Sequence, residues 1–154
     1  MGEERTVATN RQARHEYFIL ETLEAGIVLT GTEIKSVRAG RVNLKDSFAK
    51  VEGAEVFLHN LHISPYAYGN RENHEPLRTR KLLLHKAEIL RLIGKTREKG
   101  LTLIPLRLYL DVHGRAKVEL ALAKGKHVWD KREAIAEREA RREAEREVRN
   151  RQKE

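Results

Sequence analysis

Residues 101–122 read LTLIPLRLYLDVHGRAKVELAL, which is two alternating segments joined by a turn, and they decide the class of fold. Strict alternation of aliphatic and other residues is typical of strands with one buried face. The side chains expected on the outer face are Pro105, Arg107, Tyr109, Lys117, Glu119 and Ala121. Because proline cannot donate a ladder hydrogen bond, Pro105 indicates an edge strand or a bulge. The stretch predicts a long antiparallel hairpin.

Segments of the same character lie upstream. Tyr17–Leu29 is rich in aromatic and β-branched residues and reads as a strand, with a bulge or sharp bend expected at residues 24–26. Ser47–Val51 and Glu55–Ile63 flank a turn and predict a second hairpin. About six short strands with two internal helices predict a mainly β fold, a closed or nearly closed antiparallel barrel of the OB-like type.

Two helices interrupt the strands. Residues 30–33, TGTE, have the spacing of a capping box and predict a helix of about two turns. The second helix is predicted from an apolar face made by Leu83, Ala87 and Leu90, with Ile89 and Ile93 beside it. Residues 64–76 contain two prolines, one glycine and two asparagines and predict an exposed loop.

The two ends of the chain differ from this body. Residues 1–14 are polar and basic, and we expect them to be flexible until bound. The last 25 residues carry nine Lys/Arg and eight Asp/Glu but only two large aliphatic residues, so they cannot build a core. Several i, i+4 Glu–Arg pairs favour a helix. We expect this tail to be disordered when free and helical when bound. The predicted units are residues 1–14, 15–126 and 127–154.

Charge and composition restrict the classes of function. Of the net charge of +8, the tail contributes 9 − 8 = +1 and residues 1–129 contribute 22 − 15 = +7. A basic body suggests a polyanionic partner, with RNA or DNA ahead of a membrane. The chain has no cysteine, and no apolar run approaches the roughly 20 residues that span a bilayer. We expect a cytoplasmic protein without metal, cofactor or membrane partner.

Catalysis has little support in the residue pattern. No G-x-S-x-G, Walker or H-E-x-x-H motif is present, and His59 and His62 would lie on opposite faces of a strand. RNA binding is better motivated, because Tyr66 and Tyr68 precede a basic run and tyrosines can stack on bases while arginines hold phosphates. We therefore predict a protein that is not an enzyme.

Several motifs resemble one bacterial family. They are NRQARH at 10–15, EAGIVLTGTEIKSVR at 24–38, NLKDS at 43–47, ISPY at 63–66, RTRKLLL at 78–84 and AKGKHVWDKRE at 123–133. Their order and spacing are similar to those of the small protein B family, the SsrA-binding proteins that are partners of transfer-messenger RNA. The resemblance covers the chain from about residue 10 through the tail.

The resemblance implies an adaptor without catalytic activity. In that family the barrel binds the tRNA-like domain of transfer-messenger RNA, as a monomer on the RNA, and the complex enters stalled ribosomes for rescue by trans-translation. The tail is then placed in the small-subunit decoding region and in the empty messenger channel, where it folds as a helix.

Residue pattern and matched motifs together give a set of expected contacts. The candidate RNA-binding residues are Asn10, Arg11, Arg14, His15, Glu24, Tyr66, Arg78, Arg80, Lys81, Leu83, Lys117, Lys124 and Lys126. The candidate decoding-region residues are Trp129, Asp130, Lys131 and Arg132. Trp129 departs from the family pattern, in which His or Tyr is common, and His127 stands where a second Lys is usual. An indole can stack but cannot titrate.

Two other functions stay open from the residues alone. A basic structural ribosomal protein also has this composition, and it would co-purify with ribosomes at one copy each. A ribonuclease would cleave added RNA and lose activity when a carboxylate or histidine is changed.

Overall fold

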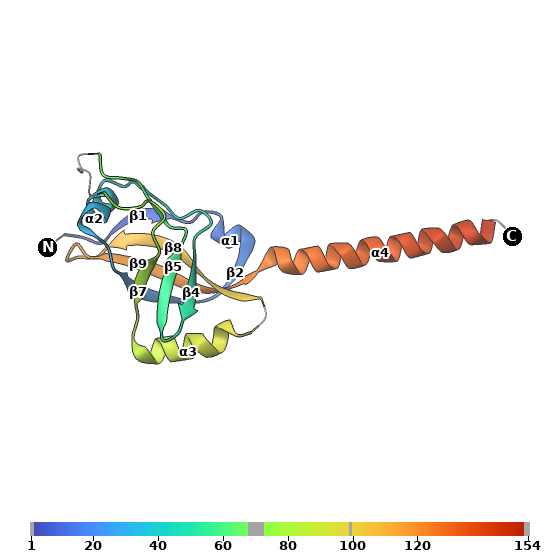
Figure 1. Cartoon of the computed structure of the whole chain (residues 1–154). Coiled ribbons are helices and arrows are strands. Elements are labelled where there is room, and N and C mark those ends of the chain that lie inside the picture. The colour runs from blue at the N-terminus through green and yellow to red at the C-terminus, as the bar shows by residue number, and fades with distance from the viewer. Residues whose placement is uncertain (1, 68–72, 99, 153–154) are drawn as a thin grey trace.

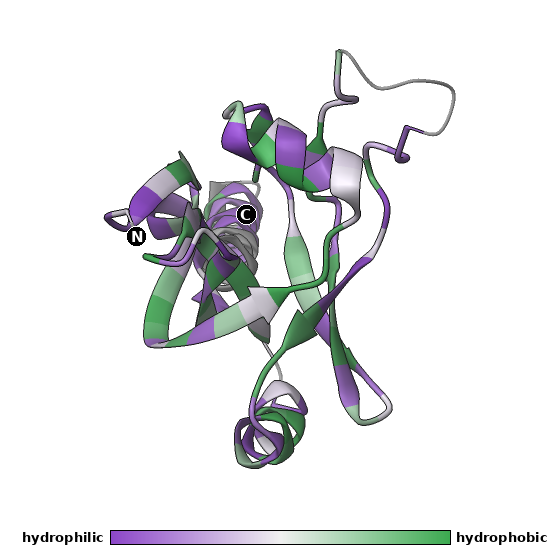
Figure 2. Ribbon diagram, turned by 90° about the vertical axis from the view of Figure 1, so that its left-hand side faces the viewer, coloured by the Kyte–Doolittle hydropathy of each residue, from purple (hydrophilic) through white to green (hydrophobic). Residues whose placement is uncertain are grey.

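The computed structural model describes residues 2–67, 73–98 and 100–152, which form a β-barrel body and one long projecting helix (Figure 1). The strands are β1 (Arg5–Thr9), β2 (Tyr17–Ile27), β3 (Val42–Asn43), β4 (Phe48–Glu52), β5 (Glu55–His59), β6 (His62–Ile63), β7 (Arg80–Leu83), β8 (Leu101–Leu110) and β9 (Ala116–Gly125). The helices are α1 (Ala13–Glu16), α2 (Gly31–Arg38), α3 (Lys86–Thr96) and α4 (Lys126–Gln152). Helices α2 and α3 lie at opposite ends of the barrel (Figure 1 and Figure 2).

Six strands close into a ring within the described part of the chain. Their order is β8-β4-β5-β7-β2-β9, and β9 pairs again with β8, always antiparallel. Strand β1 is added to β8 outside the ring. The predicted mainly β fold with a closed antiparallel barrel is confirmed. The hairpins predicted around residues 53–54 and 113–114 are β4–β5 and β8–β9.

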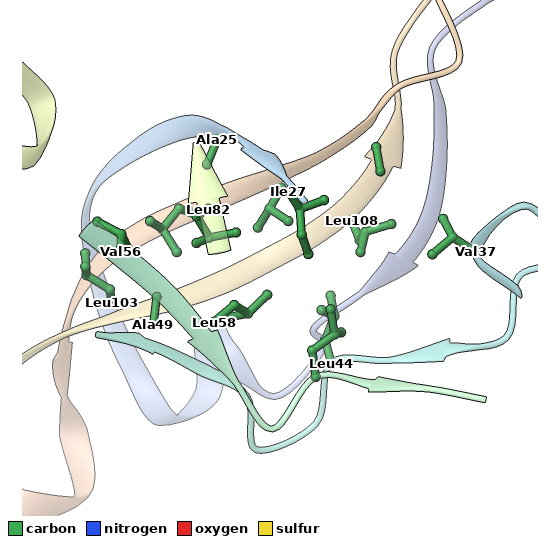
Figure 3. Close-up of a cluster of buried hydrophobic side chains, with 14 of the residues drawn as sticks. Ala25, Ile27, Val37, Leu44, Ala49, Val56, Leu58, Leu82, Leu103 and Leu108 are labelled. Carbon is green, nitrogen blue, oxygen red and sulfur yellow. The ribbon is translucent and has the colours of Figure 1, made fainter. Parts of the chain in front are cut away.

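The barrel is filled by Leu108, Leu110, Val118, Leu120 and Leu122 of the alternating pattern, but Ile104 and Leu106, which were expected on the same face, pack in a second cluster outside it, because the register shifts between Pro105 and Arg107. Leu108, Val118 and Leu120 are fully buried. Figure 3 shows Leu108 among side chains from the other strands. Ala121 was expected outside but is also buried, because Ala13 of α1 packs over it in a second apolar cluster. Both faces of the β8–β9 hairpin are therefore covered at the end nearest α1.

The prediction made from the sequence is right for the first internal helix and wrong for the buried face of the second. At α2, the Thr30 N–H donates to Glu33 Oε1 (2.8 Å) and the Glu33 N–H donates to Thr30 Oγ1 (3.4 Å), so the capping box is confirmed. At α3 the predicted apolar face is wrong. Leu83 belongs to strand β7 and Leu90 is 61% exposed, whereas Leu92 is the buried residue of the helix.

The bulges also differ from expectation. Strand β2 is regular at residues 24–26, and its register shift lies between Ile19 and Glu21. The bulge expected at Pro105 is confirmed by the register shift between Pro105 and Arg107. Strand β2 changes partner at Gly26, which pairs with β9 on one side and with β7 on the other.

The described parts of both terminal segments contain regular secondary structure. Residues 5–9 form β1 and are hydrogen-bonded to β8, so part of the segment 1–14 belongs to the sheet. The tail forms α4, which leaves the body beside α1 and β2 (Figure 1). The described side chains at 138–150 are exposed. Flexibility of residues 1–14 and disorder of the free tail stay predictions.

Candidate RNA interface

An open depression forms where β2 leaves β9 and begins to pair with β7. It has a volume of about 500 Å³ and is lined by Glu24, Gly26, Leu83, Leu84, His85, Glu88 and Lys117. Glu24, Leu83 and Lys117, which lie far apart in the sequence, are thus brought together from three strands. Leu83 is 52% exposed, and Lys117 Nζ lies 3.7 Å from Glu24 Oε1. A carboxylate, an ammonium and an exposed aliphatic side chain can together contact base, phosphate and ribose.

The charges around this depression are paired. Glu24 lies directly opposite Glu119 across the β2–β9 ladder, which is an unfavourable arrangement of like charges. Lys117 faces Glu24, while Arg107 Nε donates to Glu119 Oε2 (2.7 Å) and so compensates the second carboxylate. The Arg107 guanidinium also lies 4.1 Å from the centre of the Tyr109 ring.

Tyr109 lies beneath this charge network rather than in solvent. The alternation predicted it outside, but it is buried under Arg107. Burial first, and then a hydrogen bond with Glu24, raise the pKa of the Tyr109 phenol well above its usual value. Arg107, Tyr109 and Glu119 were not among the candidate residues; the signal that could have found them is their position on the same outward face as Lys117.

A second group of candidates gathers around α1. Arg11, Arg14 and His15 are exposed, and Lys126, from more than 100 residues later, donates a hydrogen bond through Nζ to the Arg14 carbonyl (3.0 Å). Lys124 is exposed on the neighbouring end of β9. The NRQARH and AKGK motifs therefore form one basic surface at the root of α4.

Asn10 links this surface to the barrel. Its side-chain Nδ2 donates to the Pro105 carbonyl (3.0 Å), and its backbone N–H donates to the Leu106 carbonyl (2.8 Å). Both acceptors lie at the β8 bulge. The half-buried Asn10 amide thus anchors the chain between β1 and α1.

Arg80 was expected to contact RNA, and its position in the structure contradicts this prediction. It is fully buried, and its guanidinium donates to Glu33 and to the carbonyls of Leu61 and Pro76. A side chain with no exposed area cannot reach a phosphate, so its role is structural. Arg78, which is partly exposed, donates to the other oxygen of Glu33 (2.6 Å).

The remaining basic and aromatic candidates lie close to this part of the barrel. Lys81 is exposed in part and forms an ion pair with Glu55 (3.1 Å). Tyr66 is half-buried, its backbone exchanges hydrogen bonds with the Asn73 side chain, and Lys35 Nζ lies 5.5 Å from its ring. Tyr68 lies outside the described residues. These hydrogen bonds therefore hold the described part of the 64–76 loop in place near Tyr66.

The decoding-region candidates lie in α4. The backbone of Trp129, Asp130, Lys131 and Arg132 is helical, and their side chains lie outside the described part of the structure. Across residues 2–67, 73–98 and 100–126, together with 138–150, the side chains include no group of three His, Asp or Glu that could hold a metal ion. In the same part of the chain, no helix is both long and apolar enough to cross a membrane.

Comparison with known proteins decides the family. The family model described as SmpB protein matches residues 7–150, which is most of the chain. The chain belongs to the SmpB family. SmpB relatives named SsrA-binding protein include one from Geobacillus thermodenitrificans strain NG80-2, 66% identical over 152 residues, covering 99% of this chain and 97% of that protein. Another, from Desulforudis audaxviator strain MP104C, is 69% identical over 140 residues, with 91% of each chain covered.

A solved structure agrees with the SmpB assignment. A chain in the structure described as "tmRNA-SmpB: a journey to the center of the bacterial ribosome" matches with a TM-score of 0.66 and 57% identity. The match covers 77% of this chain and 83% of that one. The resemblance inferred from the sequence motifs is confirmed.

Proposed function

We propose that this protein is an RNA-binding adaptor that binds transfer-messenger RNA and brings it to stalled ribosomes for trans-translation. The observation that carries the proposal is the convergence of Glu24, Leu83 and Lys117 on one open depression of a basic barrel. Membership of the SmpB family, whose relatives are named SsrA-binding proteins, supplies the identity of the RNA. The adaptor acts by binding and positioning, without catalysing a reaction.

The barrel and the C-terminal helix have different roles in this function. The barrel contacts the tRNA-like domain through the depression, through Asn10, Arg11, Arg14 and His15, and through the cations Lys124 and Lys126. Tyr66, Arg78 and Lys81 extend this surface. Helix α4 enters the decoding region and the messenger channel, and the residues near its start that meet the decoding region are Trp129, Asp130, Lys131 and Arg132. Its 27 residues are about 40 Å long at 1.5 Å per residue.

Truncation after Lys126 tests this division. The shortened chain should bind transfer-messenger RNA with unchanged affinity, because the barrel keeps its surface, but it should not support peptide tagging on stalled ribosomes. Its unfolding temperature, compared with that of the whole chain, shows whether the barrel stays folded. Loss of RNA binding in the truncated chain would move the RNA surface into the tail.

Substitutions in the depression test the barrel's part. Lys117→Met and Glu24→Gln should each weaken RNA binding about tenfold or more, the range of a lost charged contact. Lys95→Met on α3 removes the same charge from an exposed position outside the depression and is the matched control. Equal affinities of the Lys117 and Lys95 variants would contradict the assignment.

A further inference from the structure

A second open hollow adjoins the depression described above, on the side of α2. This apolar groove has a volume of about 460 Å³, and the side chains that line it include Ile27, Leu29, Ile34, Leu83, Arg115 and Lys117. Ligand sites in proteins commonly have volumes of about 300 to 1,000 Å³. Leu29 and Ile34 are only half-buried, so the groove offers an aliphatic surface that a ligand can contact.

The depression and the apolar groove share three residues, which lie in one row across the sheet. Gly26 of β2 pairs with Leu83 of β7 on one side and with Lys117 of β9 on the other. Because cross-strand partners point to the same face, Leu83 and Lys117 lie on the two sides of the Gly26 backbone. The row separates the depression, which Glu88 of α3 lines, from the apolar groove, which Ile34 of α2 lines.

The shared side chains match the junction between two consecutive nucleotides. Two neighbouring bases turn their apolar faces toward each other, and one phosphate joins their sugars. Leu83 is 52% exposed, and leucine is one of the side chains that proteins insert between bases as a wedge that unstacks them. Lys117 is the cation of the row and can meet the phosphate. Unpaired loop nucleotides are the part of an RNA whose bases can be separated in this way.

Arg115 supplies a further cation in the apolar groove. It lies at the turn between β8 and β9, where its Nε donates to Asp111 Oδ2 (3.0 Å) and its backbone N–H donates to Asp111 Oδ1 (2.9 Å). The Arg115 side chain is nevertheless 67% exposed. The bond from Nε uses one of the five N–H donors of a guanidinium, so the positioned group can also bind a phosphate.

We propose that Leu83 is a wedge between two consecutive loop nucleotides of transfer-messenger RNA, so that one base lies in the depression and the other in the apolar groove. Lys117 binds the phosphate between the two nucleotides, and Arg115 binds the next phosphate, beside the base in the groove. The apolar groove is therefore a second nucleobase site. This inference rests on the proposed function, which assigns no role to the groove or to Arg115.

A change at Arg115 tests the groove and leaves the depression intact. Arg115→Gln removes the charge, while two backbone N–H groups still donate to Asp111 and hold the turn. The full-length variant should bind transfer-messenger RNA about two- to fivefold more weakly, the range of an exposed ion pair. Its salt dependence should become shallower by about 0.7 to 0.9, the contribution of one phosphate. Arg91→Gln is the matched control and should bind like wild type, because Arg91 also pairs with a carboxylate, that of Glu21 (3.1 Å), but lines neither hollow.

Base fluorescence tests the wedge. Each unpaired nucleotide of the tRNA-like domain is replaced in turn by 2-aminopurine, whose fluorescence increases when its base is unstacked. The wild-type chain should brighten two consecutive positions. Leu83→Ala should stay folded, since Leu83 is half exposed, and at a concentration that saturates the RNA it should brighten neither. Arg115→Gln at saturation should keep both signals, because the wedge is still present.

Other outcomes overturn the proposal. A single bright position with the wild-type chain would mean that the apolar groove takes no base, and a bright pair that persists in Leu83→Ala would mean that Leu83 does not separate the bases. A wild-type salt dependence in Arg115→Gln would remove the phosphate from the groove. If the wild-type chain does not bind transfer-messenger RNA, the proposed function fails and this inference fails with it, whereas normal binding without a bright pair rejects the inference alone.

Discussion

Glu33 joins a helix cap to two arginines through a single buried carboxylate. One oxygen accepts from the Thr30 N–H and from Arg78, and the other accepts from Arg78 and Arg80. Arg80 in turn donates to carbonyls of the segments that enter and leave the 64–76 loop. The network therefore fixes α2, β7 and that loop relative to one another.

Removing this carboxylate should destabilise the fold strongly. Glu33→Gln leaves Arg80 as a buried charge without its ionic partner, and we expect the free energy of unfolding to fall by about 3 to 5 kcal/mol. Urea unfolding at pH 7 measures it. The exposed pair Lys81–Glu55 supplies the control, since Glu55→Gln should lower the free energy of unfolding by no more than about 0.5 kcal/mol. Similar losses in the two variants would show that burial of Glu33 has no energetic consequence.

The same carboxylate predicts how stability depends on pH. Burial alone would raise the pKa of Glu33, but hydrogen bonds from Arg78, the Thr30 N–H and Arg80 outweigh it, so the pKa lies below 4.5. The unfolded chain then binds this proton at a higher pH than the folded chain does. The stabilisation is complete above pH 4.5 and is lost as pH falls through the folded-state pKa.

Unfolding measured from pH 7 down to pH 3 should therefore separate wild type from Glu33→Gln. The difference in stability between the two should shrink below about pH 4.5, because the wild-type carboxylate becomes protonated. Asp111, whose pKa is also lowered, first by a backbone hydrogen bond with Arg115, is present in both chains and cancels. A difference that stays constant down to pH 3 would contradict the assignment.

At the scale of the elements, the partner change of β2 makes Gly26 critical for the site. A Cβ at this position would lie 3.3 Å from Cβ of Leu83, which lines the depression. Rotation of the Leu83 side chain does not move its Cβ, so β2 and β7 must shift by a few tenths of an ångström, and Gly26→Ala should cost about 1 kcal/mol of stability. It should weaken binding of transfer-messenger RNA about three- to tenfold, the effect of one displaced apolar contact.

Gly31→Ala gives the matched comparison for this prediction. An added Cβ at Gly31 has nothing within 4 Å, and the residue lies in α2 away from the depression. Its RNA affinity should equal that of wild type in a filter-binding titration. If Gly26→Ala binds as tightly as Gly31→Ala, the depression does not contact RNA through Leu83.

Local signals in the sequence predicted elements that depend on neighbouring residues. The TGTE box predicted α2, and the alternation at 101–122 predicted the β8–β9 hairpin and the Pro105 bulge. Strand β7 was missed because it has four residues and carries a buried arginine. Arg80 is buried only because Glu33, 47 residues away, neutralises it, and spacing along the chain cannot reveal that pairing.

The residues of the candidate site also divide into those that the sequence predicted and those that it missed. Family motifs identified Glu24, Leu83 and Lys117, and the structure brings them together. The supporting residues Arg107 and Tyr109 were missed, because their importance comes from the cross-strand register of Glu24 with Glu119. The predicted apolar face of α3 was wrong because the helical period was counted from Leu83, which still belongs to strand β7.

At the scale of the whole molecule, charge is divided between a cationic body and a nearly neutral arm. Residues 1–129 carry 22 − 15 = +7 and residues 130–154 carry 9 − 8 = +1. An arm of arginines alone would bind any RNA backbone by releasing counterions. We propose that the tail glutamates limit this adhesion, so that the arm reaches its channel only when the barrel has delivered it.

Charge reversal of the tail tests that balance. Replacing Glu139, Glu143, Glu145 and Glu147 by Lys adds two charges at each position and changes the tail from +1 to 1 + 8 = +9. The four side chains are exposed, and Lys and Glu have similar helix propensities, so the barrel should fold unchanged. Retention on unrelated RNA should rise, and its salt dependence should steepen by about 0.7 to 0.9 for each phosphate newly neutralised. The same four positions changed to Gln, which gives +5, should be intermediate. Equal retention in all three chains would show that the acids serve the helix alone and do not control where the arm binds.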